Sequence, residues 1–187
     1  MTRMDELKGF SLASLSNEHL RLFLELANQT RLDLLTALHH SGTGHPGGSL
    51  SSLDLYLMLW LCANVNPDQL ADAGRDRIVV SHGHTAAGVY AVLGNLGYFP
   101  KDEFICSFRK DGSRFEGHPS LEVPGVEWCS GSLGQGLSVA CGMALAAKMK
   151  QADYRVFVVM GDGEQAKGQL QEAREFAVKY HLGNLIA

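Results

Sequence analysis

The chain has 187 residues, and its hydrophobic share of 45% and charged share of 19% are ordinary for one folded domain. Its formal net charge of −4 provides no basic footprint for general nucleic-acid binding. No apolar run approaches the roughly 20 residues that cross a bilayer, and residues 1–9 lack the apolar core of a signal peptide. We therefore expect a cytoplasmic protein that contacts neither nucleic acid nor membrane.

Helix and strand patterns alternate along the chain. After an N-terminal lead at residues 1–15, Ser16 or Asn17 is suited to cap a helix that runs to about His40. Further helices are predicted at residues 50–63, 85–96, 131–149 and 165–181, and strands at residues 77–81, 154–160 and 184–187. Residues 97–129 are expected to be irregular. The alternation predicts an α/β fold in which helices flank a parallel sheet.

The first helix has a regular apolar pattern. Its apolar side chains recur at helical spacing, and Arg31 is the one polar interruption. The residues of this pattern are Leu20, Phe23, Leu24, Ala27, Leu34, Leu35 and Leu38. Such a stripe is the usual mark of a helix that packs against a core.

The predicted strand at residues 154–160 stops abruptly at Gly161-Asp162-Gly163. In open α/β sheets, ligands bind beyond the carboxyl ends of the strands. A carboxylate there can hold Mg²⁺, which in turn binds phosphate oxygens. The flanking glycines allow a phosphate to approach the backbone closely. This turn therefore predicts metal-assisted binding of a diphosphate.

Other Gly-rich loops are expected at the same edge. The loops at residues 41–48, 82–84 and 161–164 follow or face predicted strand ends, and the loop at residues 130–136 precedes a helix. Four histidines lie in Gly- or Pro-containing loops: His45, His82, His84 and His118. Histidine can donate to a phosphate, pass protons or bind a metal, and the residues alone leave these roles open.

One alternative is a zinc hydrolase. His82-Gly83-His84 follows a predicted strand and resembles the H-x-H ligand pair of several such enzymes. A zinc site needs three or four protein ligands, and His118 and Asp162 are the available candidates for the remainder.

Five segments, in their order along the chain, resemble the N-terminal, diphosphate-binding part of the transketolases, in particular the N-terminal subunit of the split type. They are His40–Gly48, Arg75–His84, Glu116–Pro119, Gly131–Gly136 and Gly161–Glu164, the last followed by Gly168 and Glu172. The resemblance covers nearly the whole chain and implies the thiamine-diphosphate-binding fold over residues 1–187. The forms of residues 81–84 and 116–119 favour a transketolase over the related 1-deoxyxylulose-5-phosphate synthases.

The resemblance implies thiamine diphosphate with Mg²⁺ (or Ca²⁺) as cofactors. Asp162 would be a metal ligand, and Gly163 would give its backbone N–H to the diphosphate. His84 would also contact the diphosphate. Gly131 and Leu133 would pack against the cofactor rings and hydrogen-bond the aminopyrimidine.

The resemblance also implies the reaction, which is transfer of a two-carbon ketol unit between sugar phosphates. His45 and His118 would be the catalytic residues that line the substrate channel and assist proton transfers. The cofactor supplies the carbanion, and the protein orients it. The resemblance further implies a magnesium-binding transferase of the pentose phosphate pathway that forms a dimer.

Three departures from the family pattern qualify this expectation. The family's second side-chain metal ligand, an Asn, would lie beyond Ala187, so we expect a domain that is incomplete at its C-terminal end and binds its cofactor weakly or not at all. Lys167 stands where many relatives carry a Glu of the dimer contact, which puts the usual pairing with Glu172 in doubt. The pyrimidine-binding domain, whose glutamate activates the cofactor, is also absent.

We therefore expect the chain to be inactive without a partner that carries this second domain, namely a C-terminal transketolase subunit or domain. A homo-oligomer or a heterotetramer would result. A non-catalytic, degenerate relative is the remaining alternative.

Overall fold

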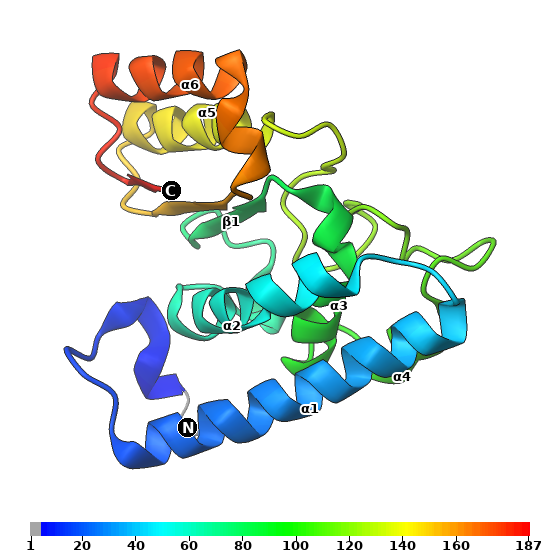
Figure 1. Cartoon of the computed structure of the whole chain (residues 1–187). Helices are drawn as coiled ribbons and strands as arrows, with labels where there is room; N and C mark the ends of the chain where they lie inside the picture. Colours follow the sequence, from blue (N-terminus) through cyan, green and yellow to red (C-terminus); the bar gives the residue numbers. More distant parts are fainter. Residues whose placement is uncertain (1–4) are drawn as a thin grey trace.

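A three-stranded parallel sheet lies at the centre of the fold (Figure 1). The computed structural model describes residues 5–187, so residues 1–4 of the predicted lead lie outside the described residues. The strands are β1 (Arg77–Val80), β2 (Val156–Val159) and β3 (Leu185–Ile186), in the order β1-β2-β3. Ile78 pairs with Phe157, and Phe157 pairs with Ile186. The predicted α/β class with a parallel sheet is confirmed.

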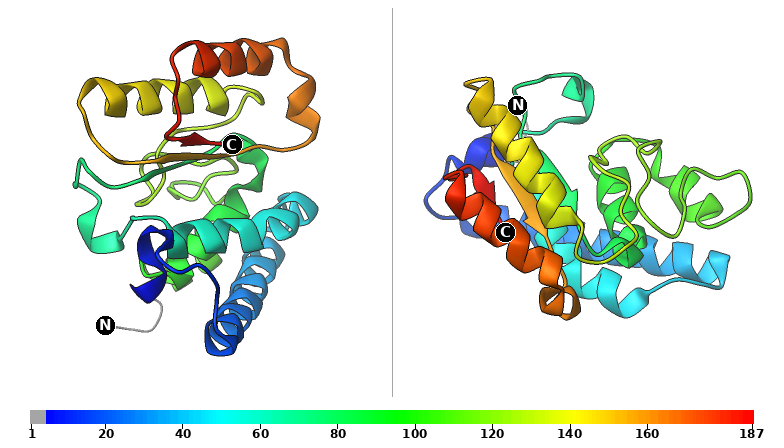
Figure 2. Two further views of the ribbon diagram at one scale, coloured as in Figure 1. Left: turned by 90° about the vertical axis from the view of Figure 1, so that its left-hand side faces the viewer. Right: turned by 90° about the horizontal axis from the view of Figure 1, so that it is seen from above.

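Helices cover both faces of the sheet, as Figures 1 and 2 show. On one face lie α5 (Gly136–Met149) and α6 (Gly168–Lys179), and on the other lie α2 (Pro46–Cys62) and α3 (Ala86–Asn95). The outer layer on that second side consists of α1 (Asn17–Ser41) and α4 (Lys101–Ser107). Short 3₁₀ helices occur at Asp5–Phe10 (η1), Pro67–Gln69 (η2), Gly83–Thr85 (η3) and Gly163–Ala166 (η4).

The strands divide the core in two. Val79, Val156 and Val158 face α5 and α6, while their neighbours Ile78, Val80, Phe157 and Val159 face the α1–α4 side. This division follows from the alternation of side chains along a strand. Because both faces are covered, the strands are continuous apolar runs rather than alternating ones.

The N-terminal lead is attached to the domain. Leu7 in η1 is buried, and the Lys8 ammonium donates to the carbonyls of Trp60 and Val65 at 2.8 and 2.6 Å. Helix α1 then begins as predicted, since the Ser16 hydroxyl accepts from the backbone N–H of His19, and the His19 ring accepts from the N–H of Ser16. This reciprocal pair is a capping box, with histidine in place of the usual glutamate.

The buried face of α1 differs from the predicted one. Ala27 and Leu34 are buried, but Leu20, Leu24 and Leu35 are each more than 40% exposed. The interior instead receives Thr30, Asp33 and Ala37. Asp33 can be buried because it accepts from the Asn95 amide and the Lys101 ammonium, both at 2.9 Å. The predicted helix is correct, but its buried side includes a polar residue, Asp33, that meets polar partners on α3 and α4.

Two further elements depart from the predictions. Helix α4 lies within the segment that was expected to be irregular, which extends to one side of the sheet (Figure 2). Pro100 at its N-cap, two acids in its first turn and the buried Phe104 explain it. The single helix predicted at residues 165–181 is two elements, because Lys167 has an extended backbone between η4 and α6.

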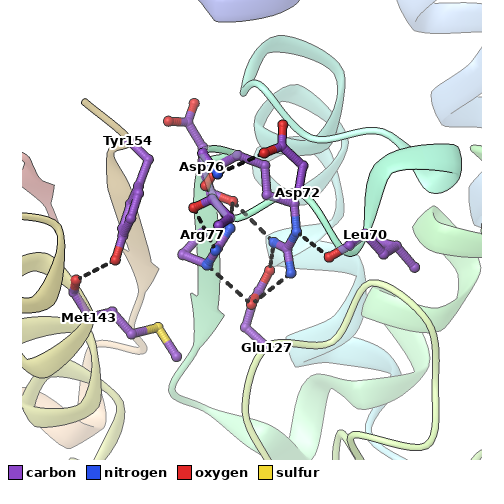
Figure 3. Close-up of polar contacts among 10 residues, drawn as sticks. Leu70, Asp72, Asp76, Arg77, Glu127, Met143 and Tyr154 are labelled. Carbon is purple, nitrogen blue, oxygen red and sulfur yellow. Dashed lines mark hydrogen bonds and ion pairs between the residues drawn. The ribbon is translucent and has the colours of Figure 1, made fainter. Parts of the chain in front are cut away.

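At the amino ends of the strands, Glu127 anchors the long irregular segment to the start of β1 (Figure 3). Its carboxylate pairs with the Arg75 guanidinium through two hydrogen bonds and lies 3.9 Å from the Arg77 guanidinium. Arg77 in turn stacks over the Tyr154 ring at 4.9 Å. The segment that leads to the predicted site loop at residues 130–136 is therefore held from the opposite end of the sheet.

Candidate functional site

A cavity of about 420 Å³ lies beyond the carboxyl ends of β1 and β2. The turns after both strands, the first part of α2 and the loop before α5 contribute to its wall. The lining residues are Gly48, Ser51, Ser52, His82, His84, Leu133, Met160, Gly161, Asp162, Gly163 and Glu164. A larger cavity of about 690 Å³ lies near η1 and Tyr98, and no residue of the predicted Gly-rich site loops lines it. The smaller one holds the convergent polar groups that mark a ligand site.

Asp162 and Gly163 stand side by side in this wall. Both are exposed, and open space surrounds the point where a side chain on Gly163 would begin. An exposed carboxylate beside a bare glycine backbone is a donor set that fits a hard cation together with its phosphate oxygens. Asp162 is therefore the residue that would hold a metal ion, and the Gly163 backbone would face the anion.

His84 and His45 lie against each other, with their ring centres 5.3 Å apart in an edge-to-face arrangement. His45 stands at the N-cap of α2, followed by Pro46 at the first helical position. Burial lowers the pKa of His84, electrostatic interaction with the His45 and His118 imidazoles lowers it further, and Glu164 opposes the shift. The three imidazoles thus share one electrostatic environment beside the cavity, although they come from three separate loops.

His82 has a different role from its neighbour His84. It is 4% exposed, and its Nε2 lies 2.9 Å from the Tyr56 hydroxyl and 3.0 Å from the Ser52 hydroxyl. Its Nδ1 lies 3.3 Å from the carbonyl of Val159, so Nδ1 carries the proton and Nε2 accepts. Burial lowers the pKa of His82, which favours this neutral form. His82 is therefore a structural residue that joins α2 to the end of β2.

The zinc-hydrolase alternative receives no support. Within residues 5–187, no three of the His, Cys, Asp and Glu side chains are grouped so that they could hold a metal ion. His82 uses both ring nitrogens for protein contacts. A cation held by Asp162 would need only that carboxylate plus phosphate oxygens and water.

The remaining predicted site residues differ in whether they line the cavity. Leu133 lines the cavity, whereas Gly131 is exposed and is not among the lining residues. His118 is exposed, and the Tyr90 hydroxyl fixes its backbone by donating to its carbonyl at 2.8 Å. The cavity therefore brings together His84, Leu133, Asp162 and Gly163, while His45 and His118 stand beside it.

Lys167 also lies next to this site. The methylene groups of its side chain pack over Gly134, whose φ of +85° is in the left-handed region. Lys167 thus makes a hydrocarbon contact with the loop that carries Leu133.

Glu164 is the residue of the site that the sequence pattern did not reveal. It is 2% exposed, and its carboxylate accepts hydrogen bonds from Ser81, Gly134 and Gly161. An acidic residue directly after a Gly-Asp-Gly turn was the available signal. The Glu164 carboxylate turns inward to these three donors and does not point into solvent.

The part of the chain that the structure describes contains no helix with both the length and the apolar character required to cross a membrane.

Comparison with known proteins agrees with this geometry. Residues 24–187 match the family model described as "Transketolase, thiamine diphosphate binding domain". The chain is 42% identical over 166 residues to one subunit of the apulose-4-phosphate transketolase of Phocaeicola vulgatus, a match that covers 88% of this chain and 59% of the relative. Transketolase from Campylobacter jejuni superimposes with a TM-score of 0.81 at 32% identity, covering 88% of this chain and 28% of that one. Transketolase from Pichia stipitis in complex with sedoheptulose 7-phosphate gives a TM-score of 0.76 at 30% identity, covering 87% and 26%.

The chain thus spans about three fifths of the P. vulgatus relative and about a quarter of the complete transketolases. The match includes the turn after β2, the histidine loops and both faces of the sheet. On these grounds the chain belongs to the transketolase family and corresponds to the family's thiamine-diphosphate-binding domain.

Proposed function

We propose that this chain is the cofactor-binding portion of a transketolase that moves a two-carbon ketol unit between sugar phosphates. The observation that carries the proposal is the cavity in which His84, Leu133, Asp162 and Gly163 meet. When bound, thiamine diphosphate supplies the carbanion chemistry of ketol transfer. The residues of this chain would bind the cofactor, orient it and shield it from water.

At the anionic end, Asp162 would bind Mg²⁺ (or Ca²⁺) through its exposed carboxylate. The Gly163 backbone and the His84 imidazole would donate to the diphosphate. The lowered pKa of His84 keeps the ring neutral near pH 7, so it donates a hydrogen bond without the desolvation cost of a buried cation. Leu133 and, further out, Gly131 would contact the organic rings.

On the substrate side, His45 and His118 would be the catalytic pair. Both are exposed, come from separate loops and lie near His84. Their proximity to His84 supports the proposal that the two imidazoles would meet the sugar phosphate at the cavity. Imidazole is the side-chain group best suited to pass protons to and from a ketose near neutral pH.

A second polypeptide domain is part of the proposal. The P. vulgatus relative is named as one subunit of a transketolase, and this chain spans only part of every relative described above. We propose that a C-terminal transketolase subunit or domain supplies the pyrimidine-binding half, in a homo-oligomer or heterotetramer. The chain alone would then bind cofactor weakly and have no activity. A cytoplasmic location in the pentose phosphate pathway fits such an enzyme.

The test is a nuclear magnetic resonance titration of the full chain with thiamine diphosphate, with and without Mg²⁺, up to millimolar concentration. We expect Mg²⁺-dependent shifts at Leu133, Gly163 and His84 in the native chain and none in Asp162→Ala. Equal shifts in both proteins would contradict the metal assignment. No shifts at all in the native chain would contradict cofactor binding and favour a degenerate relative.

A coupled assay separates a catalytic from a non-catalytic chain. The chain is mixed with a C-terminal transketolase subunit, and ketol transfer between sugar phosphates is measured. Restored transfer supports the proposal, whereas binding of cofactor without transfer in the assembled complex would leave a binding role only.

A further inference from the structure

The Glu164 side chain is the most completely buried carboxylate of the candidate site, at 2% exposure. One oxygen, Oε2, accepts from the Ser81 hydroxyl and from the Gly134 N–H, both at 2.6 Å. The other oxygen, Oε1, accepts from the Gly161 N–H at 2.8 Å. These three donors lie in three separate segments of the chain.

Each donor segment forms part of the cofactor cavity. Ser81 is the residue after β1 and precedes His82 and His84, Gly134 follows Leu133, and Gly161 precedes Asp162. The Ser81 hydroxyl oxygen also accepts from the N–H of Gly136, the first residue of α5, at 3.1 Å. A single carboxylate therefore connects the ends of two strands with the loop before a helix.

We propose that Glu164 is the positioning residue of this cavity, acting as a fixed internal anion. It locks the three segments in one arrangement, and it occupies the N–H and O–H donors that a phosphate would otherwise recruit. An external anion is then confined to the Gly163 and His84 side of the cavity. That Glu164 fixes the three segments follows from its hydrogen bonds to Ser81, Gly134 and Gly161 alone. That it steers a diphosphate rests on the function proposed above.

The chemistry of the three contacts requires a carboxylate. All three partners are donors, and an ionised carboxylate only accepts. Glutamine has the same shape but would turn an NH₂ group toward at least one of these donors. Buried donors that lose their acceptor are costly, and charge-assisted hydrogen bonds are the stronger kind.

The test compares Glu164→Gln, Glu164→Ala and the matched control Glu175→Gln, an exposed acid on α6. Amide hydrogen exchange of the full chain, without cofactor, is measured by nuclear magnetic resonance. We expect at least one of the Gly134 and Gly161 amides to exchange at least tenfold faster in Glu164→Gln than in the native chain, with a melting temperature lower by several degrees. The control should match the native chain in both respects.

Chemical rescue makes the test specific. Acetate replaces the carboxylate that Glu164→Ala removes. Acetate at a concentration on the order of 100 mM should therefore restore slow exchange at Gly134 and Gly161, while sodium chloride at equal ionic strength should not. Should Glu164→Ala fail to fold, Ser81→Ala removes one donor and keeps the carboxylate. It should accelerate exchange at Gly136 and be less than additive with Glu164→Gln.

Two results would overturn the proposal: native exchange at Gly134 and Gly161 in Glu164→Gln, or strict additivity of the Ser81 and Glu164 substitutions. A titration of the same variants with thiamine diphosphate and Mg²⁺ then tests whether Glu164 steers the diphosphate. The exchange measurement contains no cofactor, so its result holds even if the chain does not bind thiamine diphosphate. A failure of the proposed function would therefore appear only in the titration.

Discussion

Asp76 and Arg155 join the amino ends of β1 and β2. Oδ1 of Asp76 accepts from the Arg155 backbone N–H at 2.8 Å, and Oδ2 lies 3.2 Å from its guanidinium. Oδ2 also accepts from the Asn64 N–H at 2.9 Å, and Asp76 is only 3% exposed. The strands are thus bound together at one end by Asp76 and at the cavity end by Glu164, and in each case a buried acid accepts from backbone N–H groups.

Asp76→Asn is expected to lower the free energy of unfolding by about 2–3 kcal/mol, because an amide turns a donor toward the N–H groups that the carboxylate accepts from. Urea unfolding measures the change. The exposed Asp68→Asn in η2 is the control, and it should shift stability by less than about 0.5 kcal/mol. Equal effects of the two substitutions would show that the contacts of Asp76 contribute nothing.

Two glycines of α5 form a matched pair. A Cβ on Gly136 would lie 2.5 Å from the Cβ of Ser81, whereas nothing lies within 4 Å of a Cβ on the exposed Gly142. Gly136→Ala should destabilise the fold by about 1–3 kcal/mol through overpacking. Gly142→Ala should stabilise it by up to about 1 kcal/mol through higher helix propensity. Thermal unfolding of both variants tests the pair, and the same sign for both would contradict the packing described for Gly136.

The fold should lose stability as the pH falls below about 6.5, the pKa of an unperturbed histidine. The pKa values of His82 and His84 are lowered in the folded chain, so the unfolded chain binds protons first. Stability therefore rises with pH between the lowered and the ordinary pKa, and it is lost as the pH falls through that window. Urea midpoints measured from pH 7.5 to 5 follow this loss.

The His82→Asn variant identifies the main source of this pH dependence. It should be less stable at pH 7.5, because contacts with Tyr56 and Ser52 change, but its stability should fall less steeply toward pH 5. A slope identical to that of the native chain would assign the loss to other groups.

Substitution of the histidines beside the cavity should lower the rate of the reaction and leave cofactor affinity unchanged. In the assembled enzyme, His118→Ala and His45→Ala are expected to lower kcat/KM for the sugar phosphate by about a hundredfold, the scale of a lost proton-transfer group. Cofactor affinity should remain near the native value in both variants. A large loss of cofactor affinity would place these residues on the diphosphate instead of on the substrate.

Patterns that depend on near neighbours were the reliable part of the sequence. The Ser16 cap of α1, the buried strands around Val79 and Val158, and the helix that ends at Met149 depend on periodicity and local signals, and the structure confirms them. Helix α4 was missed because it is a single short element whose apolar anchor, Phe104, gives no period. The break at Lys167 was missed because an extended backbone at a single lysine between two helical segments has no signal in the sequence pattern.

The candidate site shows the same division. The Gly-Asp-Gly turn and the histidine loops could be recognised from the order of residues, since glycine, carboxylate and imidazole each suit a phosphate site. Which histidine is structural could not be recognised. His82 and His84 are two residues apart and both line the cavity, yet only His82 has both ring nitrogens bonded to the protein, through Tyr56 and the end of β2.

By itself, the sequence determined the fold class, the positions of the strand-end loops and the residue types that a metal-bound diphosphate needs, because these are properties of short segments. Only the tertiary structure decided which face of α1 is buried, which histidine is neutral and internal, and that Glu164 joins three segments. Those outcomes depend on burial and on hydrogen-bond partners brought together from distant parts of the chain, and no local pattern encodes them.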